Sequence, residues 1–241
     1  FVGFMILSSI GTILIAISLF NTQAWAAALY YLVHSTLIAA AFYLLSGWIT
    51  SQRGEFKDHF KIAPQIKQHK VVSITYFIIA LMMAGLPPFS GFFGKVFLLQ
   101  ATAQSPYQLV IIITVLVVSL LSIIAFTRVG FILFWRSTKP EVDPKKPEYA
   151  KYQALPEVAP KRNDHAIYIL LSALVLYVVF ANPIYQYISN TATQIQNNAL
   201  YEATFLKKDE HGEFISVQPF DAKNLPETKY GGVIEILGVA L

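Results

Sequence analysis

Long runs of apolar residues, separated by short polar segments, dominate this chain. No Asp, Glu, Lys or Arg occurs from residue 1 to residue 52 or from residue 165 to residue 201, and between Lys70 and Arg136 only Lys95 and Arg128 are charged. Apolar stretches of about 20 residues match the hydrocarbon core of a bilayer, which is ~30 Å thick. A soluble protein would place charged residues on each amphipathic helix. The pattern therefore predicts an all-α, polytopic bundle of transmembrane helices.

The third apolar run is interrupted by Pro87-Pro88. Two successive prolines remove two backbone donors and end a helix, and the piece that follows, ~15 residues long, is short for a full crossing. We interpret the two pieces as halves of one discontinuous transmembrane helix; a short tilted span is the alternative. The expected helices are residues 1–20, 24–50, 71–86, 89–103, 107–135 and 165–188, the last interrupted late by Pro183.

Two polar loops, residues 51–70 and 136–164, hold many of the Lys and Arg residues. Positive charge beside apolar spans is typical of the cytoplasmic face. If both loops lie on that face, residues 89–135 cross the membrane only once, which supports the discontinuous helix. The expected organisation is a transmembrane region over residues 1–188 and a polar C-terminal tail over residues 189–241.

The composition agrees with a membrane protein, since 55% of the 241 residues are hydrophobic and only 13% are charged, against about a quarter charged in soluble domains. The net charge of +4 belongs to the loops, so we expect the lipid bilayer and no nucleic acid as a partner. There is no Cys, and neither a nucleotide-binding motif nor a spacing of metal ligands is found, so neither a cofactor nor a metal is expected. Phe1 is not an initiator Met and no signal peptide precedes the first span, so we expect the chain to begin within a longer protein.

One lysine, Lys95, lies inside an apolar run, in the segment AGLPPFSGFFGK. An ionised lysine in hydrocarbon is costly, so it normally faces a bundle interior or a water-filled cavity, where burial disfavours its charged form. Such a lysine can load and release a proton. The alternative is a lysine that extends its ammonium group to the membrane interface. Small residues nearby allow close backbone approach and leave room for water, and a helix break stabilises ions. The residues of this break and its packing are Gly85, Pro87, Pro88, Ser90, Gly91 and Gly94.

His34, midway along the second span, is a second candidate proton carrier, because histidine titrates near physiological pH. Its alternative role is a hydrogen bond to a neighbouring helix. Arg128 is a possible charge partner for an acid of another subunit, or extends to the interface. Ser8, Ser9 and Gly11 of the first span are interpreted as helix-packing residues.

Three segments carry a family resemblance: FMILSSIGTILIAISL, ALYYLVHSTLIAAAFYLLSG and AGLPPFSGFFGK. They resemble the antiporter-like membrane subunits shared by Mrp-type cation/proton antiporters and respiratory complex I. They are most similar to the D subunits of the Mrp type, which is also called Pha, Mnh or Sha. The resemblance covers residues 1–136.

The resemblance implies an antiporter-like fold in the bacterial inner membrane, of which this chain is the C-terminal half. It implies that Lys95 belongs to a polar axis through the membrane and that His34 is part of the same proton relay. The N-terminal half is then expected to supply a Glu and another Lys. Many complex I relatives carry a lysine four residues after the histidine; Ile38 stands there in this chain, which favours the Mrp type.

The leading hypothesis is a secondary-transporter subunit, not an enzyme. It belongs to a monovalent cation (Na+ or K+)/proton antiporter in which Lys95 and His34 pass protons and the proton motive force drives cation export. Its expected partners are the other subunits of an Mrp-type complex, the lipid bilayer, protons, and Na+ or K+. One alternative is a proton-pumping membrane subunit of NADH:quinone oxidoreductase or a related hydrogenase. Another is a scaffold subunit that translocates nothing.

Overall fold

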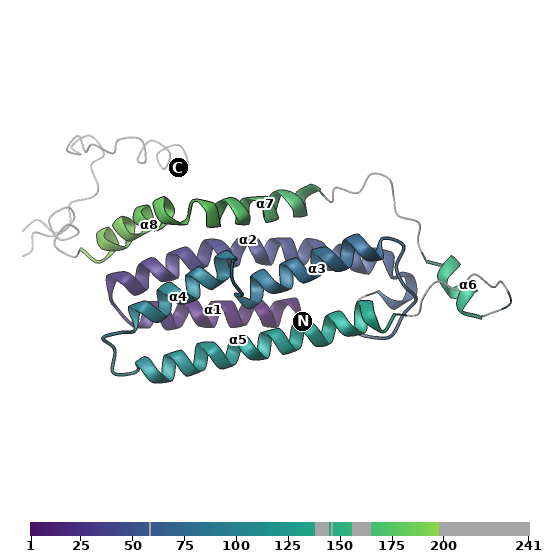
Figure 1. The fold of residues 1–241 in the computed structure, drawn as a ribbon, viewed down its shortest axis with the longest axis horizontal. Helices are drawn as coiled ribbons and strands as arrows, with labels where there is room; N and C mark the ends of the chain where they lie inside the picture. Colours follow the sequence, from purple (N-terminus) through teal and green to yellow (C-terminus); the bar gives the residue numbers. More distant parts are fainter. Residues whose placement is uncertain (58, 138–144, 146, 156–164, 198–241) are drawn as a thin grey trace, which may run out of the picture. The chain divides into compact units, whose positions relative to one another are not determined.

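The computed structural model describes residues 1–57, 59–137, 145, 147–155 and 165–197, and these residues contain helices and no strand. A 3₁₀ turn spans Gly54–Phe56, and a π-helical turn spans Phe131–Trp135. This confirms the predicted all-α fold. The helices are α1 (Val2–Ser18), α2 (Thr22–Gln52), α3 (His69–Ala84), α4 (Ser90–Ala101), α5 (Gln108–Gly130), α6 (Pro147–Gln153), α7 (His165–Val179) and α8 (Ala181–Ile195) (Figure 1).

The chain divides into two compact units, Phe1–Thr193 and Gln194–Leu241, and α1–α7 belong to the first. Two helices of this unit are long and apolar enough to cross a membrane alone: α2, and α5 extended by its π turn. The shorter helices α1 and α3 are also apolar. Most of the predicted tail, residues 189–241, lies outside the described residues, although α8 continues past Ser189 to Ile195.

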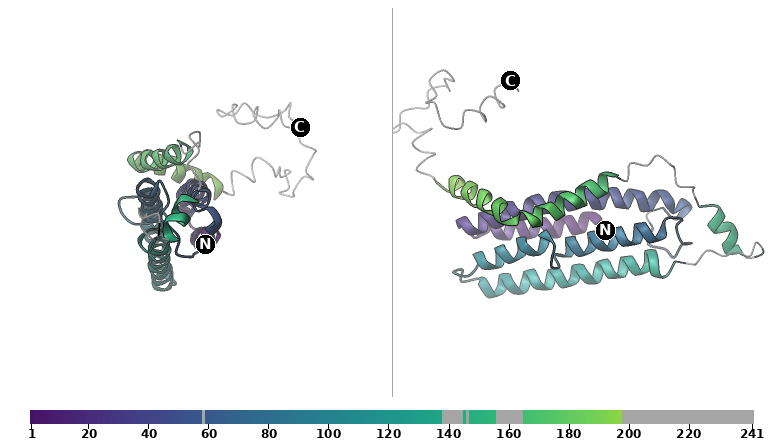
Figure 2. Two further views of the ribbon diagram at one scale, coloured as in Figure 1. Left: turned by 90° about the vertical axis from the view of Figure 1, so that its right-hand side faces the viewer. Right: turned by 45° about the horizontal axis from the view of Figure 1, so that its top comes forward.

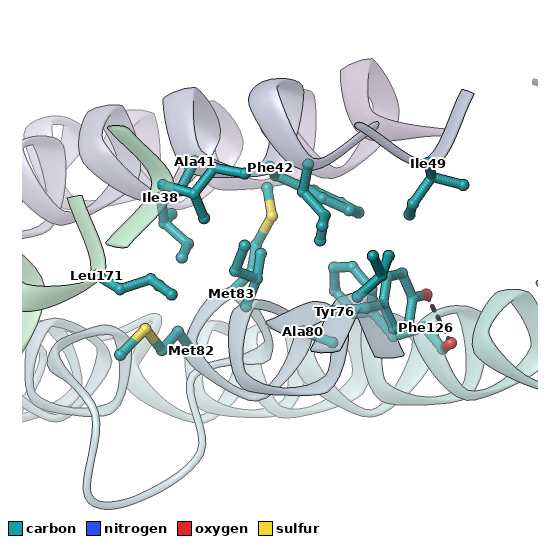
Figure 3. Packing of buried hydrophobic residues seen from close by; sticks show 14 of the residues in the cluster. Ile38, Ala41, Phe42, Ile49, Tyr76, Ala80, Met82, Met83, Phe126 and Leu171 are labelled. Carbon is teal, nitrogen blue, oxygen red and sulfur yellow. Dashed lines mark hydrogen bonds between the residues drawn. The ribbon is translucent and has the colours of Figure 1, made fainter. Parts of the chain in front are cut away.

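Helix α2 is the central element of the bundle, since it packs against α1, α3, α4 and α7. The views in Figures 1 and 2 show these helices running side by side along one long direction. The largest apolar core lies where α2, α3 and α5 meet. Figure 3 shows Phe42 of α2 facing Met83 and Tyr76 of α3, with the Tyr76 hydroxyl donating to the Phe126 carbonyl of α5 at 2.9 Å.

Buried polar side chains fix the loop that joins α2 to α3. Gln68 Oε1 accepts hydrogen bonds from Trp48 Nε1 and Gln52 Nε2, at 3.1 and 3.0 Å. The guanidinium of Arg53, only 3% exposed, donates to the backbone carbonyls of Lys57, His59 and Lys61. One cationic side chain thus satisfies three carbonyls that have no helix to pair with.

The predicted discontinuous helix is confirmed. Helix α3 ends at Ala84, α4 begins at Ser90, and the two lie nearly in line, alongside α5 (Figures 1 and 2). The two halves therefore make one passage through the bundle and α5 returns. This arrangement explains why the piece after the prolines is too short to be a crossing of its own.

The last apolar run differs from the prediction of one span over residues 165–188. Helix α7 ends at Val179, and α8 leaves it at an angle of 81°. Pro183 has no backbone N–H to donate to the carbonyl four residues earlier, which is that of Val179. The break therefore lies one turn before the proline.

Candidate functional site

The break between α3 and α4 is closed by backbone hydrogen bonds of a glycine turn. Gly85 has a left-handed backbone with φ 78°, which a residue with a side chain rarely adopts. Its N–H donates to the Met82 carbonyl at 3.2 Å, and the Leu86 N–H donates to the Leu81 carbonyl at 3.1 Å. These are the bonds of a helix C-cap. They satisfy two carbonyls at the end of α3 but leave that of Ala84 for another donor.

Lys95 supplies that donor. Its Nζ donates to the Ala84 carbonyl at 2.7 Å and to Ser119 Oγ of α5 at 2.9 Å. The lysine side chain lies directly over Gly85, where an added Cβ would be only 2.9 Å from Nζ. The carboxyl end of a helix carries partial negative charge, so the end of α3 stabilises the ammonium group. Lys95 is thus directed into the helix break and not towards the ends of the bundle.

A small polar cavity adjoins the lysine. Its volume is about 10 Å³, which is close to the least that holds one water molecule. Its polar lining comes from α1, α2, α4 and α5 and consists of Ser8, Ser9, Thr12, Tyr31, Lys95, Ser119 and Ser122. An ammonium group has three protons, two of which are donated to Ala84 and Ser119. The third is available to a water in this cavity.

The hydroxyl groups of the cavity are arranged to accept hydrogen bonds. Ser9 and Thr12 donate their own protons to carbonyls four residues earlier in α1, and Ser119 does the same in α5. Their remaining lone pairs are left for other donors. The Tyr31 hydroxyl interacts electrostatically with the side chains of Ser9 and Thr12. Lys95 and Tyr31 therefore face one cavity from two helices.

His34 packs against the first turn of α4. It is 1% exposed, and its Nδ1 shares a hydrogen bond of 2.8 Å with Ser90 Oγ at the start of α4. Its Nε2 lies so close to Gly91 that an added Cβ would approach it to 2.7 Å. Lys95 interacts electrostatically with the imidazole. The two sequence candidates, Lys95 and His34, thus belong to one site around the first turns of α4.

The glycines of α4 allow the expected close approach of neighbouring groups, but the space beside them is filled. The space beside Gly91 is taken by His34 and the Met82 carbonyl, and the space beside Gly94 by the Tyr31 ring, whose Cδ2 would lie 2.7 Å from an added Cβ. They admit two side chains of α2, and the space beside them is not left for water. The water-sized space lies instead beside α1 and α5.

Sequence reasoning missed most of the cavity. Ser8 and Ser9, interpreted as packing residues, line it, whereas Gly11 has no neighbour within 4 Å of an added Cβ. The signal in the sequence was the spacing of hydroxyl residues in α1 at 8, 9 and 12, which places them on one helix face. Arg128 is not part of this site: it is exposed on α5.

The site contains no carboxylate. No Asp or Glu occurs on α1–α5, and the described residues contain no group of three His, Cys, Asp or Glu side chains able to hold a metal ion. The charged group in the cavity is Lys95, with hydroxyls around it and an imidazole nearby. Such a set can hold one positive charge and exchange one proton with a water molecule.

Residues 3–122 match the family model described as NADH:quinone oxidoreductase/Mrp antiporter, TM. This region of the chain belongs to that family. Lys95, His34 and all of the helix break lie within the matched residues. The apolar helices and the family together make it a multi-pass membrane protein.

Named relatives in this family agree with the resemblance to Mrp-type D subunits. The chain is 27% identical over 206 residues to the D subunit of the Na(+)/H(+) antiporter of Alkalihalophilus pseudofirmus, covering 86% of this chain and 39% of the relative. It is 29% identical over 204 residues to the D subunit of the Na(+)/H(+) antiporter of Bacillus subtilis (84% and 38%). It is 28% identical over 221 residues to the D subunit of a probable K(+)/H(+) antiporter of Rhizobium meliloti (80% and 38%). The chain therefore spans about two fifths of the length of these relatives.

A solved structure shows the same fold. A chain in the structure of the Mrp complex from Dietzia sp. DQ12-45-1b superimposes with a TM-score of 0.64 at 21% identity. The match covers 83% of this chain and 43% of that chain. The predicted antiporter-like fold is thereby confirmed.

Proposed function

We propose that this chain is part of the D subunit of a multi-subunit monovalent cation/proton antiporter in a bacterial inner membrane, and that Lys95 carries the proton. The names of the relatives, as D subunits of Na(+)/H(+) or K(+)/H(+) antiporters, support the activity. The other subunits of such a complex are its partners. The remaining part of the D subunit supplies the groups that continue the proton path.

The observation that carries the proposal is the position of the Lys95 ammonium group. It lies in a helix break, on the Ala84 carbonyl and Ser119, beside a cavity with room for about one water. In the loaded state the break stabilises the positive charge. In the release step one proton passes from Nζ to the cavity water, leaving a neutral amine and a hydronium ion whose charge the lone pairs of the surrounding hydroxyl groups stabilise.

His34 is the group from which the amine reloads. A proton on His34 and a proton on Lys95 repel each other, because the two groups interact electrostatically. A proton on one of these two groups therefore favours release of the proton from the other, which gives the proton transfers a preferred order. Ser90 holds the imidazole in place through Nδ1, leaving Nε2 to exchange the proton.

The proton-pumping subunit of NADH:quinone oxidoreductase remains the second candidate, because the family description names both classes. Ile38 stands where many complex I relatives have a lysine, and the named relatives above are antiporter subunits. Both observations favour the antiporter.

Cation/proton exchange by everted membrane vesicles that contain the complete complex tests the role of Lys95. We expect Lys95→Ala to lower the rate by at least about tenfold while the complex still assembles. Lys95→Arg keeps the charge but cannot lose a proton, so it should be as inactive as Lys95→Ala. The control is Lys70→Ala, which removes an exposed lysine at the start of α3 and should keep the normal rate.

Normal exchange by Lys95→Ala in an assembled complex would refute the relay. If the chain is only a scaffold subunit, His34→Ala should also exchange cations and protons at the normal rate. A wild-type complex that exchanges no cation but pumps protons when a quinone reductase is attached would support the second candidate instead.

A further inference from the structure

The outer face of α5 carries a groove that the proton site does not use. Its volume is about 480 Å³, and its walls combine apolar side chains with two arginines. Both Arg128 and Arg136 are exposed. The residues that line the groove are Ile123, Ile124, Thr127, Arg128, Phe131, Ile132 and Arg136.

The π-helical turn places the two arginines on one face. Residues eight apart in an α-helix are separated by about 80° around its axis. Between Arg128 and Arg136 the chain forms the turn Phe131–Trp135, closed by a hydrogen bond from the Arg136 N–H to the Phe131 carbonyl at 2.8 Å. This bond spans five residues instead of four, so the turn contains an extra residue and rotates Arg136 back towards Arg128. The shared groove is the result.

The charges of this pair are not balanced by the helices around them. No Asp or Glu occurs between residues 59 and 140, and neither guanidinium group has a hydrogen bond or ion pair with another described residue. Two like charges in one groove repel each other unless an anion lies between them. Arginine also binds phosphate through two parallel hydrogen bonds, which makes a phosphate oxygen a suitable counter-charge.

The depth of the groove in the membrane indicates what carries that phosphate. Trp135, at the end of the π turn, is 67% exposed and stacks on Phe131, and exposed tryptophans belong to the membrane interface. Below the arginines the face of α5 continues with exposed apolar residues, including Leu116, Leu120 and Ile124. The anion is therefore placed at headgroup level, directly above a surface that fits an acyl chain.

We propose that this groove is a binding site for one anionic phospholipid. Its phosphate lies between Arg128 and Arg136, and an acyl chain lies against Ile123, Ile124 and Phe131. The proposal concerns a lipid at the outer face of α5 and does not depend on the proton relay.

Native mass spectrometry of the complete complex in mild detergent tests the site, with phosphatidylglycerol added to delipidated protein. We expect the double variant Arg128→Gln/Arg136→Gln to bind phosphatidylglycerol roughly tenfold more weakly than the wild type. Ile124→Trp fills the groove without changing its charge and should weaken binding as well. Lys70→Gln removes one exposed positive charge outside the groove and should bind as the wild type does.

Other additions identify the ligand. Zwitterionic phosphatidylcholine should bind equally weakly to wild type and double variant, and inorganic phosphate should not compete with phosphatidylglycerol at equal concentration. Equal binding of phosphatidylglycerol by wild type and double variant would overturn the proposal. So would competition by phosphate alone, or loss of a protein subunit from the double variant, since the arginines would then hold a free anion or an acidic protein segment.

Discussion

Tyr30 and Tyr31 are neighbours in α2 whose hydroxyl groups have opposite surroundings. The Tyr31 ring packs on Gly94, and its hydroxyl interacts electrostatically with Ser9 and Thr12 at the Lys95 cavity. The Tyr30 side chain is fully buried between Phe97 and Tyr177, with ring centroids 5.1 and 4.6 Å away, and its hydroxyl has no hydrogen-bond partner among the described residues. The pair therefore provides a matched test of the cavity.

Replacement of each tyrosine by phenylalanine should have opposite effects. Tyr31→Phe removes the polar interaction of this hydroxyl with Ser9 and Thr12, worth about 1 kcal/mol, and should lower the thermal unfolding temperature in detergent and slow cation/proton exchange several-fold. Tyr30→Phe removes an unsatisfied buried hydroxyl, which costs about 1–3 kcal/mol, so it should leave exchange unchanged and raise the unfolding temperature. A larger decrease of the exchange rate in Tyr30→Phe than in Tyr31→Phe would contradict the assignment of Tyr31 to the Lys95 cavity.

The charged members of the site were predictable from sequence, but its hydroxyl groups were not. Lys95 stands out because it is a lone charge in a long apolar run, and a charged side chain in hydrocarbon is energetically costly and usually has a function. Ser9, Thr12 and Ser119 give no such signal, because a hydroxyl in a membrane helix commonly bonds its own backbone, as these three do. Only the packing of four helices shows that they also face the lysine.

Close contact between α2 and α4 depends on the glycines of α4. An alanine at position 91 would place its Cβ 2.6 Å from the Met82 carbonyl and 2.7 Å from His34 Nε2. The first of these is backbone at the end of α3, so the clash cannot be relieved by a side-chain rotation alone. Gly91 therefore contacts both the end of α3 at the helix break and the His34 imidazole, so a larger residue at position 91 would displace both.

Gly91→Ala should destabilise the protein by about 1–3 kcal/mol, the usual cost of overpacking, and should lower exchange by displacing His34. The control is Gly11→Ala in α1, where an added Cβ meets nothing within 4 Å; it should be neutral or stabilising by about 0.5–1 kcal/mol. Thermal unfolding of both variants in the same detergent measures the difference. Equal unfolding temperatures for the two variants would show that α4 does not approach α2 as closely as described.

The two helix breaks differ in how well sequence located them. Pro87-Pro88 follows Gly85, so the end of α3 has both a glycine cap and residues that cannot continue the helix. Pro183 stands alone, and its effect falls on the carbonyl of Val179, so the bend lies one turn earlier than the proline. The sequence shows the proline, which lacks the N–H group. The bend forms four residues earlier, at the carbonyl that the missing N–H leaves without a hydrogen bond.

For the whole molecule, the paired half-helices determine which loops share a side of the membrane. With α3 and α4 as one crossing, the loop after α2 and the segment after α5 lie on the same face, and the turn between α4 and α5 lies on the other. With α3 and α4 as two crossings, these two polar segments would lie on opposite faces. Positive charge in both segments favours one shared, cytoplasmic face.

Single cysteines can distinguish these topologies, because the chain contains no cysteine of its own. Lys61→Cys after α2 and Lys151→Cys in α6 replace exposed residues, and both should react with a membrane-impermeant maleimide in everted vesicles but not in intact cells. Gln104→Cys, in the exposed turn after α4, should show the reverse. Leu120→Cys on the exposed apolar face of α5, 57% exposed in the chain alone, should react in neither, since thiols ionise and react in water and not in hydrocarbon. Labelling of Lys61→Cys and Lys151→Cys from opposite sides would mean that α4 crosses the membrane by itself, and Lys95 would then not lie at the middle of a broken span.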